Sequence, residues 1–423
     1  MDFENSVNGH PKDIERQTLL GDYKVKKPLR DTNLFNVIVL GFAFCILFIA
    51  FSPTQNLETT INKNAGFISL TIIYACLSLS NFVSPLIVLK VGEKYSLIIG
   101  TLTYIAYIAA NIYTNTILLY IASAVLGFGA AILWTAEGAF VIRCSTESTL
   151  GFHTGLFFAL FQANQIVGNL GTAELIKAGY SDRTLFIILT ITCAVSIFIF
   201  LFLGNPDNST DDKPKEILST KERLMLTLNL LKDRPIQLLI IALFYSGISQ
   251  SFFFGDFPPL VGKNNLGYVM TVFGVCDALG SVIIGKVSDI IGRSPMIIFA
   301  TLCCLGGTIF TYIIDRYISD HQLVLYFVCA GMMGFADAGY NTQLYSLLGS
   351  LYPTKGESAA AVFKFIQAIA SALAFFYGPY TNLFQNVVIT GSLVVPSCIL
   401  FVIVDKVFNQ KKTDTIQTTP NTY

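Results

Sequence analysis

Residues 285–295 have the sequence Gly-Lys-Val-Ser-Asp-Ile-Ile-Gly-Arg-Ser-Pro and separate two long apolar runs. These runs cover residues 266–285 and 295–314. Each is close to the roughly 20 apolar residues that cross ~30 Å of hydrocarbon as a helix. We therefore interpret residues 285–295 as a tight polar loop at a membrane face, because a soluble fold does not require two such runs in succession.

The composition also indicates a membrane protein. The 423 residues are 53% hydrophobic and 13% charged, whereas soluble domains carry about 25% charged residues. The net charge is zero and no long basic run is present, which argues against nucleic-acid binding. The nine cysteines form no CxxC pair and no His cluster is present, so we expect neither disulfides nor a metal site. Without a GxxxxGK[ST] loop or a Ser, His and Asp constellation, we expect no cofactor and no enzyme activity.

Apolar runs of spanning length recur along the chain, and they predict an all-α membrane protein with twelve transmembrane helices. The runs fall at residues 33–52, 65–89, 96–113, 117–142, 151–175, 184–203, 236–256, 266–285, 295–314, 323–348, 358–378 and 385–404. The domains that we expect are an N-terminal tail (1–32), a six-helix bundle (33–204), a polar linker (205–235), a second six-helix bundle (236–404) and a C-terminal tail (405–423).

The distribution of Lys and Arg predicts the orientation. With the N-terminus inside, 21 of the 27 basic residues lie in the tails, the linker and the inward loops. Cytoplasmic loops carry such an excess. An odd number of spans would put the tails on opposite faces and remove the asymmetry. We expect both termini to be cytoplasmic.

The two halves resemble each other at nearly constant offsets. Matching segments are 85–94 with 285–294, 127–128 with 334–335, and 158–163 with 363–368. Two parallel six-helix repeats with a site near the bilayer midplane are typical of the major facilitator fold. The motif at residues 285–293 resembles the loop signature of that superfamily, in which the Asp and Arg pair at the cytoplasmic gate. The resemblance assigns this gate to Gly285, Asp289, Gly292 and Arg293, whereas the first copy has Leu89 and Glu93 at the two charged positions.

Ionisable residues inside spans are costly and are functional candidates. Glu137, Asp277, Asp337 and Lys364 are the clearest examples. From the rise of ~1.5 Å per residue, we hypothesise that Lys364 meets Asn341 and Asp337, with Asp277 at a comparable depth. Two interpretations remain open, a static ion pair that fixes helix packing and a cluster that binds substrate or couples protons.

Other polar residues within spans also leave two interpretations open. Glu137 lies near the cytoplasmic end of its span, where it is either a solvated, snorkelling carboxylate or a proton carrier. Gln162, Asn164 and Gln165 belong to an unusually polar run. Their amides either bond neighbouring helices or line a pore.

Longer motifs resemble one branch of the superfamily. The segments Gly-Phe-Gly-Ala-Ala-Ile-Leu-Trp-Thr-Ala-Glu-Gly at 127–138 and Gly-Leu-Phe-Phe-Ala-Leu-Phe-Gln at 155–162 resemble the UNC-93-like branch. The segments Gly-Phe-Ala-Asp-Ala-Gly-Tyr-Asn-Thr-Gln-Leu at 334–344 and Ala-Val-Phe-Lys-Phe-Ile-Gln at 361–367 resemble its subgroup called major facilitator superfamily domain-containing protein eleven. The resemblance covers residues 33–404.

The resemblance implies two functions, which the sequence leaves open. One is secondary transport of an unknown small solute or ion across the lipid bilayer. The other is a non-transporting role as regulator or trafficking partner of an ion channel or receptor. The segment Glu-Arg-Gln-Thr-Leu-Leu, with Glu15, Leu19 and Leu20, resembles an acidic dileucine sorting signal. The alternative for this segment is a disordered tail, so we expect either the plasma membrane or an endosomal or lysosomal membrane.

Epitope accessibility tests the orientation and the sorting signal together. We expect an N-terminal epitope to be stained only after the cells are permeabilised, because this tail faces the cytosol. The double variant Leu19→Ala with Leu20→Ala should move the protein to the cell surface, as quantified by surface biotinylation. Staining of the tail in intact cells would contradict the orientation, and an unchanged distribution would contradict the signal.

Overall fold

A computed structural model describes residues 32–113, 115–146, 149–206, 225–226, 229–318, 323–353 and 355–409. Within these ranges the chain is helical with short connections, and it contains no strand. The sorting-signal candidates Glu15, Leu19 and Leu20 lie outside the described residues, as do most of the predicted linker and the C-terminal tail from residue 410.

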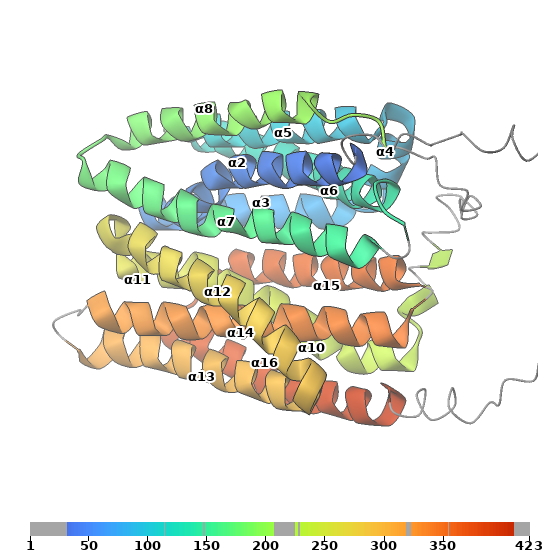
Figure 1. Ribbon diagram of the computed structural model, residues 1–423. Helices are drawn as coiled ribbons and strands as arrows, with labels where there is room; N and C mark the ends of the chain where they lie inside the picture. The colour runs from blue at the N-terminus through green and yellow to red at the C-terminus, as the bar shows by residue number, and fades with distance from the viewer. Residues whose placement is uncertain are drawn as a thin grey trace, which may run out of the picture.

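The described residues form long helices that run roughly parallel to one another (Figure 1). In chain order the elements are α2 (Thr32–Ile61), α3 (Lys63–Ser80), α4 (Ser84–Val91), α5 (Glu93–Ala110), α6 (Thr116–Arg143), α7 (Leu150–Lys177), α8 (Asp182–Leu201), α10 (Arg234–Ser251), the π-helix η1 (Phe252–Asp256), α11 (Phe257–Val261), α12 (Lys263–Ile291), α13 (Arg293–Tyr317), α14 (Leu323–Leu351), α15 (Gly356–Tyr377), the 3-10 helix η2 (Gly378–Tyr380), α16 (Leu383–Val404) and the π-helix η3 (Asp405–Asn409).

Ten helical segments of the described chain are long and apolar enough to cross a membrane. The long helices α5 and α7 are not among them. Helix α5 opens with the charged residues Glu93 and Lys94, and α7 contains the polar amide run, which lowers its mean hydropathy. The protein is therefore an all-helical integral membrane protein with many apolar helices.

Two boundaries differ from the predicted runs, one because polar residues are buried in a helix and the other because the chain turns before a proline. The first run was predicted to end at residue 52, but α2 continues to Ile61. Residues 54–59 of this extension are all buried, so their polar side chains lie against other helices and do not form a solvated loop. The second run is interrupted after Ser80, and Pro85 stands at the start of α4. Proline suits the first turn of a helix because it lacks an N–H group.

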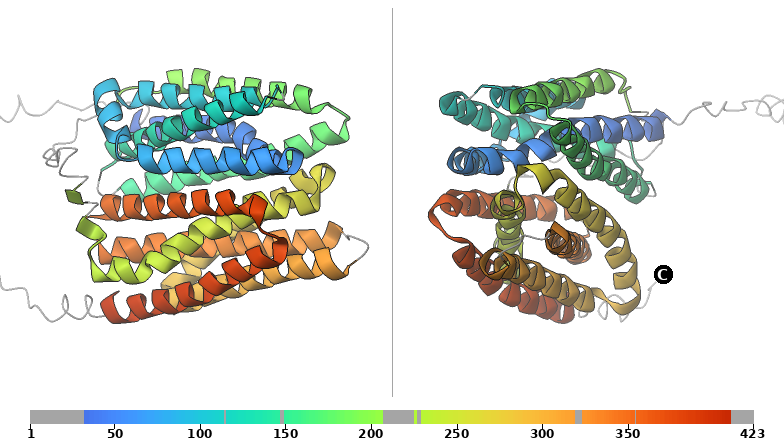
Figure 2. Two further views of the ribbon diagram at one scale, coloured as in Figure 1. Left: turned by 180° about the vertical axis from the view of Figure 1, so that it is seen from behind. Right: turned by 90° about the vertical axis from the view of Figure 1, so that its left-hand side faces the viewer.

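The helices pack in two groups, which the end-on view in Figure 2 separates clearly. In the first group α2 packs against α7 and α8, α3 against α6, and α5 against α6 and α8. In the second group α10 packs against α15 and α16, α12 against α14, and α13 against α14 and α16. Contacts between the groups are made mainly by α7 with α12 and by α3 with α15.

Glycines allow α7 and α12 to approach closely. A Cβ atom on Gly267 would lie 2.4 Å from the carbonyl oxygen of Asn169, and one on Gly274 would lie 2.6 Å from the Cβ of Gln165. Small residues at such crossings let helix backbones approach each other in membranes. This crossing brings polar side chains of the two groups together.

The stretch at residues 285–295 is mostly helical, which corrects our interpretation of it as a loop. Helix α12 continues to Ile291, Gly292 alone reverses the chain with φ 91° and ψ 168°, and α13 begins at Arg293. Gly92, with φ 85° and ψ 153°, does the same between α4 and α5. Residues with a Cβ rarely adopt this backbone region. The matching sequence segments therefore form matching turns.

The variant Gly292→Ala should lower stability by about 1–3 kcal/mol, because alanine is strained at this φ and ψ. Heating the purified protein and measuring the fraction that stays monodisperse by size-exclusion chromatography tests this. Gly349→Ala is the matched control, since its Cβ would meet nothing within 4 Å inside α14. We expect the control to retain or slightly gain stability. Equal behaviour of the two variants would contradict the prediction.

Candidate functional site

The contact between Asp277 and Gln162 joins the two groups of helices. Asp277 of α12 is 7% exposed, and the Gln162 amide of α7 donates a hydrogen bond of 3.4 Å to its Oδ2. Gly267 and Gly274 lie at the crossing of α12 with α7, and Asp277 lies about one turn after Gly274 on α12 at the same crossing. A carboxylate is thus held at the interface of the groups with an amide as its hydrogen-bond partner.

Asp337 of α14 lies near this contact. Its carboxylate repels that of Asp277 and is attracted by the ammonium group of Lys364 on α15. Asn341, one turn further along α14, donates to the backbone carbonyl of Asp337 at 3.1 Å. The structure therefore brings together Asp277, Asp337, Asn341 and Lys364, which the sequence placed at comparable depth.

We expected Lys364 to contact Asn341 and Asp337 directly, and this prediction is wrong. Lys364 donates to Oε1 of Gln367 on its own helix at 2.8 Å. Its ammonium group also lies 5.6 Å from the ring centre of Tyr345 and 5.3 Å from that of Phe363. No ion pair with Asp337 forms among the described residues. The ammonium group instead contacts the Gln367 amide, three residues further along α15, and the rings of Tyr345 and Phe363.

The amide run of α7 mainly bonds neighbouring helices. Asn164 is 1% exposed and accepts a hydrogen bond of 2.8 Å from Ser52 of α2. Gln162 reaches α12, as described above. Gln165 accepts from Asn169 at 3.2 Å and lies against Gly274. One helix therefore contacts both groups through different amides.

Glu137 of α6 is buried, with 8% of its surface exposed. It makes no hydrogen bond or ion pair with any described residue. A snorkelling carboxylate solvated at the membrane surface would be exposed, so the first of our two interpretations does not fit this conformation. The second interpretation, a proton carrier, remains a prediction.

Arg293 does not pair with Asp289, which corrects the expected gate pair. Its guanidinium group donates to Asp405 at 3.3 Å and to Ser346 of α14 at 2.8 Å, whereas Asp289 is exposed on the last turn of α12. The turn at Gly292 separates the two side chains, because Arg293 opens α13 and faces α14 and the end of α16. Gly285 does not mark a close approach, since the nearest atom to its Cβ would be 3.8 Å away.

The first copy of this turn also carries an ion pair, although its charges differ. Glu93, which aligns with Arg293, pairs with Arg143 at the end of α6 at 2.7 Å. Lys94 donates to the carbonyl oxygens of Leu201 and Leu203 at 2.8 Å. These two residues lie at the end of α8 and just after it. In each copy, therefore, charged side chains at the turn bond the ends of two neighbouring helices.

Sequence reasoning missed polar contacts at the opposite end of the bundle, where α11 lies (Figure 1). Lys263 at the start of α12 pairs with Asp182 at the start of α8. Tyr268 donates to Glu174 of α7 at 2.7 Å. Both pairs join the two groups, and the paired residues lie in separate loops or helix ends that no local pattern connects.

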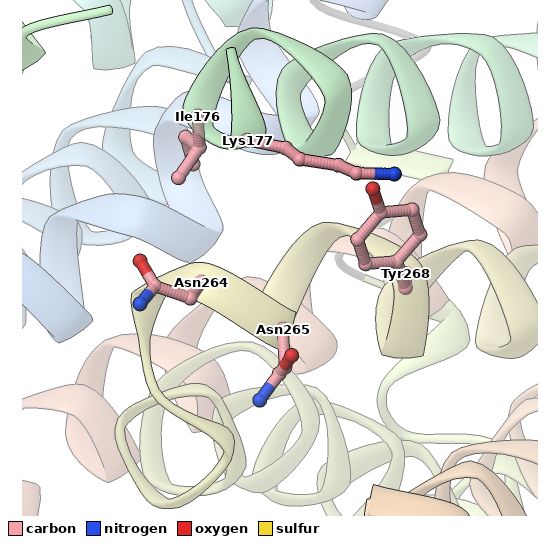
Figure 3. A pocket seen from close by; sticks show the side chains of 5 residues that line it. All are labelled: Ile176, Lys177, Asn264, Asn265 and Tyr268. Carbon is pink, nitrogen blue, oxygen red and sulfur yellow. The ribbon is translucent and has the colours of Figure 1, made fainter. Parts of the chain in front are cut away.

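A surface pocket of about 480 Å³ lies beside these pairs (Figure 3). It is lined by Ile176 and Lys177 of α7 and by Asn264, Asn265 and Tyr268 of α12. Figure 3 shows the Lys177 side chain extending toward the Tyr268 hydroxyl. Among the described residues, no group of three His, Cys, Asp or Glu side chains is arranged to hold a metal ion.

Glu58 was also missed, because it lies between the first two predicted apolar runs, 33–52 and 65–89. It lies on the extended part of α2 with 1% of its surface exposed, and its carboxyl group shares a hydrogen bond with the Tyr107 hydroxyl of α5. The polar residues around it gave no sequence signal that α2 continues past residue 52.

Comparison with known proteins identifies relatives along most of the chain. The family model of the ion channel regulatory protein UNC-93 matches residues 57–402. UNC93-like protein MFSD11 of Xenopus laevis is 29% identical over 414 residues, which cover 84% of this chain and 92% of that protein. UNC93-like protein 3 of Arabidopsis thaliana is 29% identical over 383 residues, which cover 82% of this chain and 81% of that protein.

Solved structures share the fold at much lower identity. A POT family transporter in complex with 5-aminolevulinic acid superposes with a TM-score of 0.69 at 11% identity, covering 89% of this chain and 96% of that one. A D-xylose-proton symporter gives a TM-score of 0.66 at 13% identity, covering 89% and 97%. These similarities show the fold of major facilitator transporters and do not identify a substrate.

The Lys364→Met variant tests whether this lysine fixes helix packing. We expect its folded yield to stay within about twofold of the wild type, because an exposed charge contact contributes only about 0–1 kcal/mol. Fluorescence-detected size-exclusion chromatography measures the yield. Gly247→Val is the control, since a Cβ there would lie 2.2 Å from the carbonyl oxygen of Gln367 between α10 and α15. A loss with Lys364→Met as large as that of the control would favour a static packing role.

Proposed function

This chain belongs to the UNC-93 family of multi-pass membrane proteins, and from that premise we propose that it is a secondary transporter. It would move a small solute or ion by alternating access, in which two helix groups rock around a central site. The known relatives and the fold are those of membrane transporters and channel regulators.

The contact between Asp277 and Gln162 carries this proposal. It places a buried carboxylate at the interface between the helix groups, with Asp337 and Lys364 nearby. Charged groups at such depth are costly in lipid and mark substrate or ion paths. A protein that needed only a stable fold would gain more from apolar packing at this position.

We further propose that the chain crosses the membrane twelve times as two six-helix repeats, 33–204 and 236–404. The helix pairs of the two groups correspond one to one when α2 is matched with α10, α3 with α12, α5 with α13, α6 with α14, α7 with α15 and α8 with α16. The same matching converts the contact of α7 with α12 into the contact of α15 with α3, so the two contacts between the groups also correspond. The excess of basic residues supports an orientation with both tails in the cytoplasm.

The contacts at the α11 end would close the transporter on one side. The pairs Lys263 with Asp182 and Tyr268 with Glu174 join the groups there. The turns at Gly92 and Gly292 lie at the opposite end of the helices. The region of Gly285, Asp289, Gly292 and Arg293 would form the gate on that side, with Arg293 held by Asp405.

One observation favours a second candidate function. The matching family model is named for ion channel regulation. A regulator could keep the same fold and use a lipid-facing helix surface to hold a channel or receptor subunit. The polar cluster would then stabilise one arrangement of the helix groups.

Reconstituted liposomes with a pH-sensitive dye and a broad panel of solutes test the transport proposal. We expect flux of at least one solute. Asp277→Asn should reduce its initial rate about tenfold or more, because a lost charged hydrogen bond costs about 1.5–3 kcal/mol. Asp315→Asn, at an exposed position near the end of α13, is the control and should leave the rate unchanged.

Two results would reject the transport proposal. One is the absence of flux for every solute together with a channel or receptor subunit that copurifies stoichiometrically from native membranes. The other is flux that Asp277→Asn and Asp315→Asn leave equally unaffected, which would remove the observation on which the proposal rests.

A further inference from the structure

Four side chains form a buried polar chain inside the first helix group, away from Asp277. They are Glu58 of α2, Ser69 of α3, Tyr107 of α5 and Ser123 of α6. Glu58 is 1% exposed and the other three are fully buried. Bulk solvent therefore does not reach these side chains, and they hydrogen-bond one another.

This buried polar chain consists of four successive contacts, and at one end it reaches a backbone carbonyl. Ser123 donates to the carbonyl oxygen of Leu119 at 2.7 Å. The hydroxyls of Ser69 and Ser123 are 2.9 Å apart, and those of Ser69 and Tyr107 are 3.2 Å apart. The Tyr107 hydroxyl is in turn hydrogen-bonded to Oε2 of Glu58, with Tyr107 as the donor when this carboxyl group is ionised.

Counting protons along this chain shows where one is missing. Each hydroxyl has a single proton to donate, so three hydroxyls supply three of the four hydrogen bonds. When all four contacts are hydrogen bonds at once, the carbonyl of Leu119 can only accept, so Ser123 uses its proton there. Ser69 must then donate to Ser123, and Tyr107 must donate to Ser69. The last bond needs a proton from Glu58, because Tyr107 has already used its own.

The surroundings of Glu58 supply no positive charge. No Lys, Arg or His side chain pairs with it among the described residues. The titratable groups that interact with it are Tyr107 of α5 and Tyr120 of α6. The Asn111 amide also lies beside the carboxyl group, although its hydrogen bond of 3.1 Å goes to the backbone carbonyl of Tyr107. Its second oxygen has no hydrogen-bond partner. An ionised carboxylate buried in this way is far more costly than a neutral acid.

We propose that Glu58 is a proton-binding site, whose carboxyl group carries a proton in this conformation and donates it in a hydrogen bond to Tyr107. The proton completes a chain that links α2, α3, α5 and α6. Loss of the proton would leave one bond of the chain unmade and a buried charge with no cation beside it, so proton occupancy favours this packing of the four helices. The proposal does not depend on whether the protein transports a solute.

Infrared difference spectra of the full-length protein in nanodiscs at neutral pH test the site. Subtracting the Glu58→Gln spectrum from that of the wild type should reveal a lost C=O band of a carboxylic acid and no lost carboxylate bands. Glu174→Gln is the matched control, because this carboxylate also bonds a tyrosine hydroxyl but is exposed. It should lose carboxylate bands only. Loss of carboxylate bands with Glu58→Gln would overturn the proposal.

A second variant covers the case in which Glu58→Gln does not fold. Tyr107→Phe removes the acceptor of the Glu58 proton, so the carboxylic acid band should shift to higher frequency without disappearing. A Tyr107→Phe spectrum that differs from the wild type only in tyrosine bands would show that no protonated acid bonds Tyr107, and it would reject the proposal.

Discussion

Two glycines of α12 bring its backbone against that of α7 without a side chain between them. A Cβ on Gly267 would come within 2.4 Å of a carbonyl oxygen of α7, and one on Gly274 would meet Gln165 at 2.6 Å. Lipid supplies no hydrophobic force between helices, so close packing and polar contacts must join the two helix groups. The same crossing sets Asp277 against Gln162. The candidate site is thus a consequence of how the two groups pack.

The sequence predicts the helices well because lipid imposes a length and an apolar composition on each span. Every predicted apolar run lies on a long helix to within a few residues, except that the run 65–89 also covers the turn after Ser80 and part of the short helix α4. Polar ends were less predictable. Residues 54–59 look like a loop by composition, but neighbouring helices bury them and keep α2 continuous to Ile61. The turns at Gly92 and Gly292 were located correctly, and only their length was overestimated.

The proximity of the buried charged residues was predicted, but their contacts were not. Depth along a helix follows from residue number, which explains why Asp277, Asp337 and Lys364 were grouped correctly. Partner choice also depends on helix rotation and side-chain rotamers, which residue number does not give. Arg293 therefore binds Asp405, 112 positions away, instead of the nearby Asp289. Lys364 likewise bonds Gln367 of its own helix and lies over the Tyr345 ring of α14 instead of pairing with Asp337.

Charge balance connects the separate polar regions of the bundle. Glu58, Glu137, Asp277 and Asp337 all lie within the helix groups, whereas Lys364 is the basic residue placed among them. One ammonium group offsets one carboxylate, and the others would remain as negative charges in a medium where each costs several kcal/mol. Hydrogen bonds such as that from Gln162 to Asp277 offset part of this cost, and neutralising the rest requires protons or bound cations. That requirement holds for a transporter, in which the neutralising ions would move, and equally for a channel regulator, in which their occupancy would set the helix packing.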